Sequence, residues 1–386
     1  MTLGELAPLD LEPLSAAGRL DRLRARLGGA GVDGGPVDAL LVTTPANIRW
    51  LTGFTGSAGV LAVTAERALL TSDGRYRTQS TEQLAGAGVG DQVSVSIGGV
   101  TDQRAALVEL LGSAATVGLE ADQVSWSGQR SWDELLAAAS LVPTRGLVEA
   151  LRVVKDEGEV RRMERAAAIA DRALEEVLPR LALGSTTEAA FAAALDHAMR
   201  QRGAEESAFE TIVASGPNSA KPHARPGPRT IGAGDPVVVD FGAVYDGYRS
   251  DMTRTFVVGG EPAGELARVF SVVAASQRQG VEAVRPGVEA GSVDRTCRAV
   301  IEEAGWLDRF EHGTGHGVGL DIHEAPSVGP GSTAILAPGA VVTVEPGVYL
   351  PGTGGVRIED TLVVTDGGSR PLTLFPKEVP VMRNTR

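Results

Sequence analysis

Residues 237–258 read VVVDFGAVYDGYRSDMTRTFVV, in which two apolar runs flank the dipeptide Asp246-Gly247. An Asp-Gly pair between alternating apolar residues is a strong signal for a two-residue β-hairpin turn. We therefore expect an antiparallel hairpin in which Tyr245 lies opposite Tyr248. This pair fixes the register of the whole hairpin, because each further pair lies one residue farther from the turn on both strands.

The register places the two aspartates of the hairpin on one face. Gly242 lies opposite Asp251, and residues two apart along a strand share a face, so Asp240 and Asp251 become diagonal neighbours. Their backbones would lie roughly 7–8 Å apart, and carboxylates reaching toward each other can share ions about 3.5–4 Å apart. A one-residue slip would send one aspartate to the opposite face. Taken alone, the pair is equally compatible with ordinary charges at a strand edge.

Two glutamates interrupt a second pair of apolar segments. Residues 340–350 (AVVTVEPGVYL) and 354–364 (GGVRIEDTLVV) indicate two strands joined through a loop rich in glycine and proline. Glu345 and Glu359 each stand in a run that is otherwise apolar, which is costly unless the charge is paired or bound. The loop holds several candidate turn glycines, so the register stays open, and Asp360 is an alternative to Glu359 as the inward-facing acid.

Histidines concentrate near these segments. The chain has only five histidines, and one run, EHGTGHGVGLDIHE at 311–324, contains three of them. The glycines interleaved in this run argue against a helix and favour an extended segment whose backbone is closely approached by its neighbours. Four histidines lie in or near the acidic segments: His223, His312, His316 and His323.

Together these segments indicate one dinuclear metal site. Four carboxylates and one imidazole suit two hard or borderline divalent cations such as Mn²⁺, Co²⁺ or Zn²⁺. Without cations, so much like charge in one place would strongly disfavour full ionisation. The candidate ligands are Asp240, Asp251, His316, Glu345 and Glu359.

These motifs resemble the metallopeptidase family with the pita-bread fold, which includes aminopeptidase P, prolidase, methionine aminopeptidase and the metal-free creatinase. The resemblance covers about residues 155–386. A further match, NIRWLTGFTGSAG at 47–59 followed by LLTSDGRY at 69–76, resembles the N-terminal domain of Xaa-Pro peptidases. It implies an α+β fold, with a C-terminal pita-bread catalytic domain (151–386) preceded by a smaller creatinase-like α/β domain (1–150).

The resemblance also implies a role for each ligand. The family pattern puts Asp240 on one metal ion, His316 and Glu345 on the other, and Asp251 and Glu359 between the two. This pattern favours Glu359 over its acidic neighbour. Manganese is the metal expected, with cobalt or zinc as alternatives.

Further active-site residues follow by the same resemblance. His223, His312 and His323 match additional histidines of the family, and Arg357 matches an arginine near the substrate. Two cations would lower the pKa of a bridging water and give a hydroxide near neutral pH. Glu345 would accept its proton and pass it to the leaving nitrogen, while His323 and His223 would hydrogen-bond the developing oxyanion.

The expected activity is removal of the residue before proline at a peptide N-terminus. Several prolidases carry an arginine just after the HE-x-P segment, whereas this chain has Ser327 there, which favours aminopeptidase P over a strict Xaa-Pro dipeptidase (prolidase). A non-catalytic pita-bread binding protein and a creatinase-like amidinohydrolase are alternatives. The complete ligand set argues against both.

Composition sets broader limits. The 386 residues fit two domains, and the net charge of −13 argues against non-specific nucleic-acid binding. The lone Cys297 excludes an intramolecular disulfide. No stretch has 18 uninterrupted apolar residues, and Met1–Asp10 lacks the pattern of a secretory signal. We therefore expect a cytoplasmic protein that acts on proline-containing peptides and does not bind membranes; the resemblance implies a homodimer.

Coarse secondary structure follows from periodicity. An amphipathic helix is expected at 15–28, and Ser185 and Glu188 have the spacing of a capping box. Short strands alternate with helical stretches in the N-terminal region. Helices of the C-terminal region are expected near 156–182, 187–202, 263–283 and 290–305.

Overall fold

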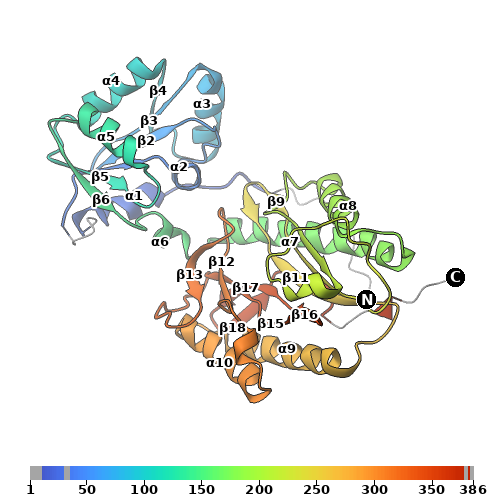
Figure 1. The fold of residues 1–386 in the computed structure, drawn as a ribbon. Helices are drawn as coiled ribbons and strands as arrows, with labels where there is room; N and C mark the ends of the chain where they lie inside the picture. The colour runs from blue at the N-terminus through green and yellow to red at the C-terminus, as the bar shows by residue number, and fades with distance from the viewer. Residues whose placement is uncertain (1–10, 30–34, 378–380, 383–386) are drawn as a thin grey trace. The chain divides into compact units, whose positions relative to one another are not determined.

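The computed structural model describes residues 11–29, 35–377 and 381–382, so the N-terminal segment Met1–Asp10 lies outside the described residues. The chain divides into two compact units, which meet in sequence between Arg152 and Val153 (Figure 1). Within the described residues, no helix combines the length and the apolar character needed to span a bilayer.

The N-terminal unit is built on a six-stranded mixed sheet of order β4-β3-β2-β1-β5-β6. Strand β1 pairs antiparallel with β2 and parallel with β5. The strands are β1 (Ala39–Val42), β2 (Val60–Thr64), β3 (Ala68–Ser72), β4 (Ser94–Ile97), β5 (Thr116–Glu120) and β6 (Ser140–Thr144). The helices are α1 (Arg19–Arg24), α2 (Pro45–Thr52), α3 (Arg77–Gly86), α4 (Val100–Leu111), α5 (Trp126–Leu135) and α6 (Glu149–Arg152).

The amphipathic helix expected at 15–28 is shorter than predicted. Helix α1 begins after Gly18, which has a left-handed backbone (φ 72°), and covers only Arg19–Arg24. A short 3₁₀ turn at Leu27–Gly29 follows it. The two glycines at 28–29 lie in this turn, where they disfavour continuation of a regular helix.

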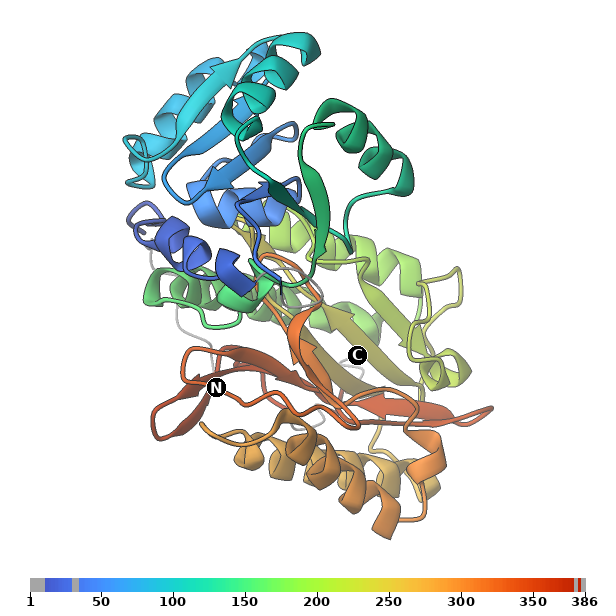
Figure 2. The same cartoon turned by 90° about the vertical axis from the view of Figure 1, so that its left-hand side faces the viewer.

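The C-terminal unit sandwiches two sheets between two pairs of helices. One sheet has the order β19-β11-β8-β7 and the other β13-β12-β14-β17-β18. Helices α7 and α8 share an apolar core with β8 and β11, whereas α9 and α10 pack on β14 to β17 and run beneath these red strands in Figure 2. The helices are α7 (Glu157–Val177), α8 (Glu188–Gln201), α9 (Gly264–Ala283) and α10 (Ala290–Glu303).

The strands of this unit carry every candidate ligand at or beside their ends. The first group is β7 (Ile212–Ser215), β8 (Pro236–Phe241), β9 (Val244–Tyr245), β10 (Tyr248–Arg249), β11 (Met252–Val258) and β19 (Val381–Met382). The second group is β12 (Gly315–Gly317), β13 (Glu324–Val328), β14 (Val341–Val344), β15 (Gly347–Leu350), β16 (Gly354–Arg357), β17 (Asp360–Thr365) and β18 (Gly368–Pro371).

The capping box predicted at Ser185 and Glu188 does not form. Thr187 is the N-cap of α8, and its hydroxyl accepts a hydrogen bond from the backbone N–H of Ala190 at 3.1 Å. The Glu188 carboxylate turns elsewhere and accepts a hydrogen bond from the backbone N–H of Ser215 at 2.8 Å. The spacing is therefore present in the sequence without the interaction it usually signals.

The first hairpin has the predicted register. Tyr245 lies opposite Tyr248, and the turn between them has positive φ at both Asp246 (44°) and Gly247 (71°), as a tight hairpin turn requires. The same count continues into β8 and β11, where Thr253 lies opposite Asp240.

The second hairpin also keeps one register along its length. Val344 of β14 lies opposite Asp360 of β17, and Gly347 of β15 lies opposite Arg357 of β16. Two residues intervene on each strand, so Glu345 must lie opposite Glu359. Asp360 therefore points to the other face of the hairpin.

The glycine-rich run at 311–324 contains the extended segment that we predicted. A Cβ on Gly315 would lie 2.1 Å from the carbonyl oxygen of Thr343, and one on Gly317 would lie 2.2 Å from that of Ala325. Only glycine permits such close approach of two backbones.

Replacing Gly242 with alanine tests how tightly the first hairpin is closed. The added Cβ would lie 1.9 Å from the carbonyl oxygen of Ser250, so the strands must separate. We expect the free energy of unfolding to fall by about 1–3 kcal/mol, measured by chemical denaturation. Gly260→Ala is the control, because an added Cβ there meets nothing within 4 Å. Equal stability of the two variants would contradict the close packing.

Candidate metal centre

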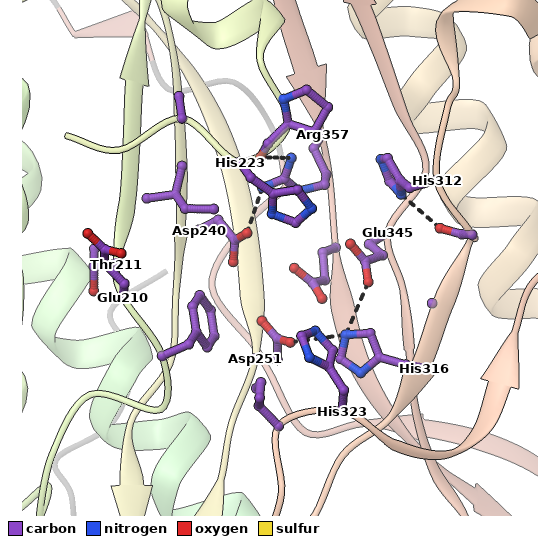
Figure 3. A pocket seen from close by; sticks show the side chains of 18 of the residues that line it. Glu210, Thr211, His223, Asp240, Asp251, His312, His316, His323, Glu345 and Arg357 are labelled. Carbon is purple, nitrogen blue, oxygen red and sulfur yellow. Dashed lines mark hydrogen bonds and ion pairs between the residues drawn. The ribbon is translucent and has the colours of Figure 1, made fainter. Parts of the chain in front are cut away.

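Three acidic residues from the two hairpins meet in the interior. Asp240, Asp251 and Glu359 are all buried, and one carboxylate oxygen from each lies within 4.8 Å of the others. Asp240 is the second-last residue of the buried strand β8, and Asp251 immediately precedes β11. Glu359 comes from the break between β16 and β17. Figure 3 shows Asp240 and Asp251 projecting toward the opposite wall, which carries His316 and Glu345.

His316 and Glu345 extend this cluster. The Nε2 atom of His316 lies 3.3 Å from Oε1 of Glu345 and 3.5 Å from Oδ2 of Asp251. Its Nδ1 atom lies 3.0 Å from the carbonyl oxygen of Gly317, an acceptor only, so Nδ1 carries the proton. Nε2, which faces the two carboxylates, is then the atom that could bind a metal ion. The hydroxyl of Thr343 orients Glu345 by donating a hydrogen bond of 3.1 Å.

Unpartnered oxygens show that the donor set fits divalent cations. Oδ1 of Asp240 and Oε1 of Glu359 are buried and have no hydrogen-bond partner. The other oxygen of each group is held, since Arg357 donates to Asp240 at 2.6 Å and Thr253 donates to Glu359 at 2.6 Å. Buried carboxylate oxygens without partners are costly. Carboxylate oxygens are ligands that hard cations prefer, so divalent cations would satisfy both.

Burial and like charge shift the acidity of this cluster. Burial is the largest influence raising the pKa of Asp240, Asp251 and Glu359. Glu359 further raises the pKa of Asp251, and Glu345 raises that of Glu359. The charge of Arg357 opposes the rise in pKa at Asp240. The carboxylates therefore hold protons more readily than free ones, and cations would favour their ionised forms.

His316 and Glu345 behave as an ion pair in the metal-free protein. Burial alone would raise the pKa of Glu345, but the hydrogen bond and charge of His316 bring it to about 2. Burial likewise lowers the pKa of His316, but Glu345 outweighs it and raises this pKa overall. A cation at the site would have to replace the proton that the two groups share.

A chain of hydrogen bonds links His312 to Asp240. Arg357 donates to Asp240 and also to the Tyr349 hydroxyl at 2.8 Å, and that hydroxyl lies 2.9 Å from Nε2 of His312. Nδ1 of His312 lies 2.8 Å from the carbonyl oxygen of Gly313. Because that oxygen can only accept, Nε2 accepts the Tyr349 proton. His312 is therefore neutral, in line with burial lowering its pKa.

A cavity of about 530 Å³ opens onto the cluster. His223 and His323 are exposed in its wall, and Arg357 is buried there. The ring of His323 packs edge-on against that of His316, with centroids 4.4 Å apart. All nine predicted site residues line this cavity: His223, Asp240, Asp251, His312, His316, His323, Glu345, Arg357 and Glu359.

Comparison with known proteins identifies the family. The family model described as metallopeptidase family M24 matches residues 161–366, more than half of the chain. The chain belongs to metallopeptidase family M24. The creatinase/prolidase N-terminal domain matches residues 19–154, so the predicted resemblance is confirmed over both parts of the chain.

Relatives with known sequences or structures align over nearly the whole length of this chain. The chain is 40% identical to an uncharacterized peptidase of Bacillus subtilis, over 94% of this chain and 100% of that one. An Xaa-Pro dipeptidase from Bacillus anthracis superposes with a TM-score of 0.88 at 39% identity, covering 95% and 100% of the two chains. An X-Pro aminopeptidase from Thermotoga maritima does so with a TM-score of 0.82 at 33% identity, covering 89% and 97%. The predicted pita-bread fold is confirmed.

Three residues that hold the M24 site were missed in the sequence. Thr253, Thr343 and Tyr349 each bond a predicted site residue. Strand alternation could have found two of them, because Thr253 follows Asp251 by two positions and Thr343 precedes Glu345 by two. Residues two apart on a strand share a face.

Binding of metal ions should release protons from the candidate ligands. The raised pKa values of Asp251 and Glu359 mean that these groups keep their protons to a higher pH than free carboxylates do, and ligands must lose their protons to bind. We expect about one proton or more to be released per site, and apparent Mn²⁺ affinity to rise with pH. Calorimetric titration in buffers of different ionisation enthalpy measures the release. An enthalpy independent of buffer, with affinity constant between about pH 5.5 and 7.5, would contradict it.

Proposed function

We propose that this M24 protein is a dinuclear metal-dependent exopeptidase that hydrolyses the Xaa-Pro bond at the N-terminus of peptides. The carrying observation is the convergence of five donor residues from distant segments, with two buried oxygens that lack partners. The names of the relatives support the substrate class, since both an Xaa-Pro dipeptidase and an X-Pro aminopeptidase share the fold.

The ligand assignment divides the cluster between two ions. In this proposal Asp240 would hold one ion, His316 and Glu345 would hold the other, and Asp251 and Glu359 would serve both. The position of Asp251 supports its bridging role, because it contacts His316 on one side and belongs to the acidic trio on the other. We propose manganese as the metal, with cobalt or zinc as alternatives. Two such ions would supply a water that is acidic enough to ionise near neutral pH.

Proton transfer falls to Glu345. Its carboxylate lies in the cavity wall beside His316 and the acidic trio. In this proposal Glu345 accepts a proton from the attacking water and delivers it to the nitrogen of the leaving proline. Burial lowers the pKa of His323, so its neutral ring can donate one N–H to the developing oxyanion. His223 shares this task in the proposal.

Selectivity for proline follows from its amide. Proline has no N–H and a fixed φ, so the site need not accept a hydrogen bond from the scissile nitrogen before cleavage. The free amine of the substrate would bind near Asp240, whose other oxygen Arg357 holds. Arg357 would thus act beside the substrate by fixing this acid.

The length of the substrate peptide distinguishes an aminopeptidase from a dipeptidase. Ser327 lies in the cavity wall and is exposed, where several prolidases carry an arginine that reads the substrate carboxylate. We therefore favour an aminopeptidase that accepts longer peptides, with a strict Xaa-Pro dipeptidase as the alternative. A homodimer and a cytoplasmic location remain predictions for this protein.

Removing the bridging Asp251 should abolish turnover. We expect Asp251→Ala to lower kcat/KM on an Xaa-Pro peptide by more than the roughly 10–100-fold typical for loss of a residue that only orients a ligand. Bound metal per chain should fall as well. The exposed Asp366→Asn is the control, with activity and metal content unchanged. Full turnover in the alanine variant would rule out the bridging role of Asp251. If the fully metallated wild-type protein cleaved no Xaa-Pro peptide, the enzymatic function would be ruled out in favour of a binding protein.

Substrate length can be tested at Ser327. The wild-type enzyme should cleave Xaa-Pro-Xaa-Xaa at least as well as Xaa-Pro. Ser327→Arg should shift kcat/KM toward the dipeptide by about 10-fold, because it adds a charge-assisted bond to the terminal carboxylate. Ser327→Gln, which is polar and uncharged, controls for size. A wild-type enzyme that cleaves only dipeptides would reverse the assignment.

A further inference from the structure

A buried glutamate that does not line the cavity holds the segment that carries His223. Glu188, the first residue of α8, has no exposed surface. Its Oε1 accepts hydrogen bonds from the backbone N–H and the hydroxyl of Ser215, at 2.8 and 2.7 Å. Oε2 accepts from the backbone N–H of Gly227 at 3.1 Å, and the Asn218 amide reaches both oxygens at 3.1 and 3.3 Å. One carboxylate thus binds the beginning and the end of segment 215–227.

The middle of this segment is attached to the metal-binding hairpin. The backbone N–H of Gly355 donates to the hydroxyl of Ser219 at 2.8 Å. Arg357 donates to the carbonyl oxygen of Pro222 at 3.2 Å, immediately before His223. In Figure 3 His223 lies close to Arg357. The position of the His223 backbone therefore depends on Glu188 at the base of the segment and on Arg357 near its tip.

Glu188 is not needed to start its own helix. Thr187 already caps α8 through its hydroxyl. A carboxylate in the first turn of a helix is favoured by the helix dipole, but an exposed side chain would benefit in the same way. Glu188 is fully buried and accepts several hydrogen bonds from one segment. We infer that its carboxylate serves to hold that segment. Arg229 supports the same arrangement by donating to the Ser215 hydroxyl at 2.6 Å.

We propose that Glu188 is a positioning residue for His223. It closes segment 215–227 into a loop of fixed shape and so sets the distance between the His223 ring and the reacting carbonyl. This inference rests on the proposed function, in which His223 contacts the developing oxyanion. Glu188 itself touches neither substrate nor metal. Its loss should affect catalysis through the position of His223.

A double-mutant cycle tests this dependence. Glu188→Gln keeps the shape of the side chain but replaces an acceptor oxygen with a donor, so either the Ser215 or the Gly227 contact is lost. We expect Glu188→Gln and His223→Ala each to lower kcat on an Xaa-Pro peptide by about 10- to 100-fold, with little change in KM and unchanged metal content. The double variant should be no slower than His223→Ala alone, because coupled residues are not additive.

Hydrogen–deuterium exchange provides a readout that needs no catalysis. Amides of residues 215–227 should exchange faster in Glu188→Gln and at the wild-type rate in His223→Ala. Glu120→Gln is the matched control, because Glu120 is a buried carboxylate of the N-terminal unit that also accepts several hydrogen bonds, among them those of Thr43 and Thr44. It should leave exchange in 215–227 unchanged. Asn218→Ala serves if Glu188→Gln does not fold, and it should act in the same direction. It removes the amide that donates to Glu188 and also the acceptor of Lys221 Nζ at 2.9 Å.

The outcomes separate this proposal from the proposed function. Wild-type exchange in 215–227 of the Glu188 variant, or of Asn218→Ala in its place, would overturn the positioning role. So would kinetic losses that multiply in the double variant. A wild-type protein without Xaa-Pro activity would instead overturn the proposed function, and the exchange experiment would still decide whether Glu188 holds the segment.

Discussion

Like charge confined to a buried space is the constraint on which this molecule depends. Three carboxylates have oxygens within 4.8 Å of one another, and repulsion at that range is strong in a low-dielectric interior. The surrounding chain holds one oxygen of each outer acid: Arg357 binds Asp240, and Thr253 binds Glu359. The oxygens that remain are directed into a common space that divalent cations would balance.

The fold meets this constraint by joining two hairpins along their inner faces. The backbone N–H of Glu359 donates to the carbonyl of Thr253 at 3.1 Å, and the Thr361 hydroxyl donates to that of Asp251 at 2.8 Å. Behind them the buried Arg254 bonds the carbonyl of Thr253 at 2.9 Å. Helices cover the outer faces with apolar contacts. Ligands carried on strands fixed in this way are held more precisely than ligands on loops.

The two hairpins differ in how far local sequence could define them. Asp246-Gly247 permits one tight turn, so the first register and the shared face of its aspartates could be predicted and are confirmed. The second turn has several glycines, and only the observed pairing of Val344 with Asp360 shows which acid faces inward. Strand β6, with the sequence SLVPT, lies at a sheet edge, where a proline is tolerated and burial imposes little alternation, so its sequence gives only a weak strand signal.

The sequence by itself determined the kinds of donor, the helices with strong apolar periodicity and the face of each residue in the first hairpin. These properties depend on neighbours a few positions away, which the chain spells out directly. Only the tertiary structure decided that Glu345 opposes Glu359, that Tyr349 joins His312 to Arg357, and that Glu188 binds a distant loop instead of capping its helix. Each of these contacts joins residues that are distant in the sequence. Local periodicity does not identify such partners, because it depends only on residues a few positions apart.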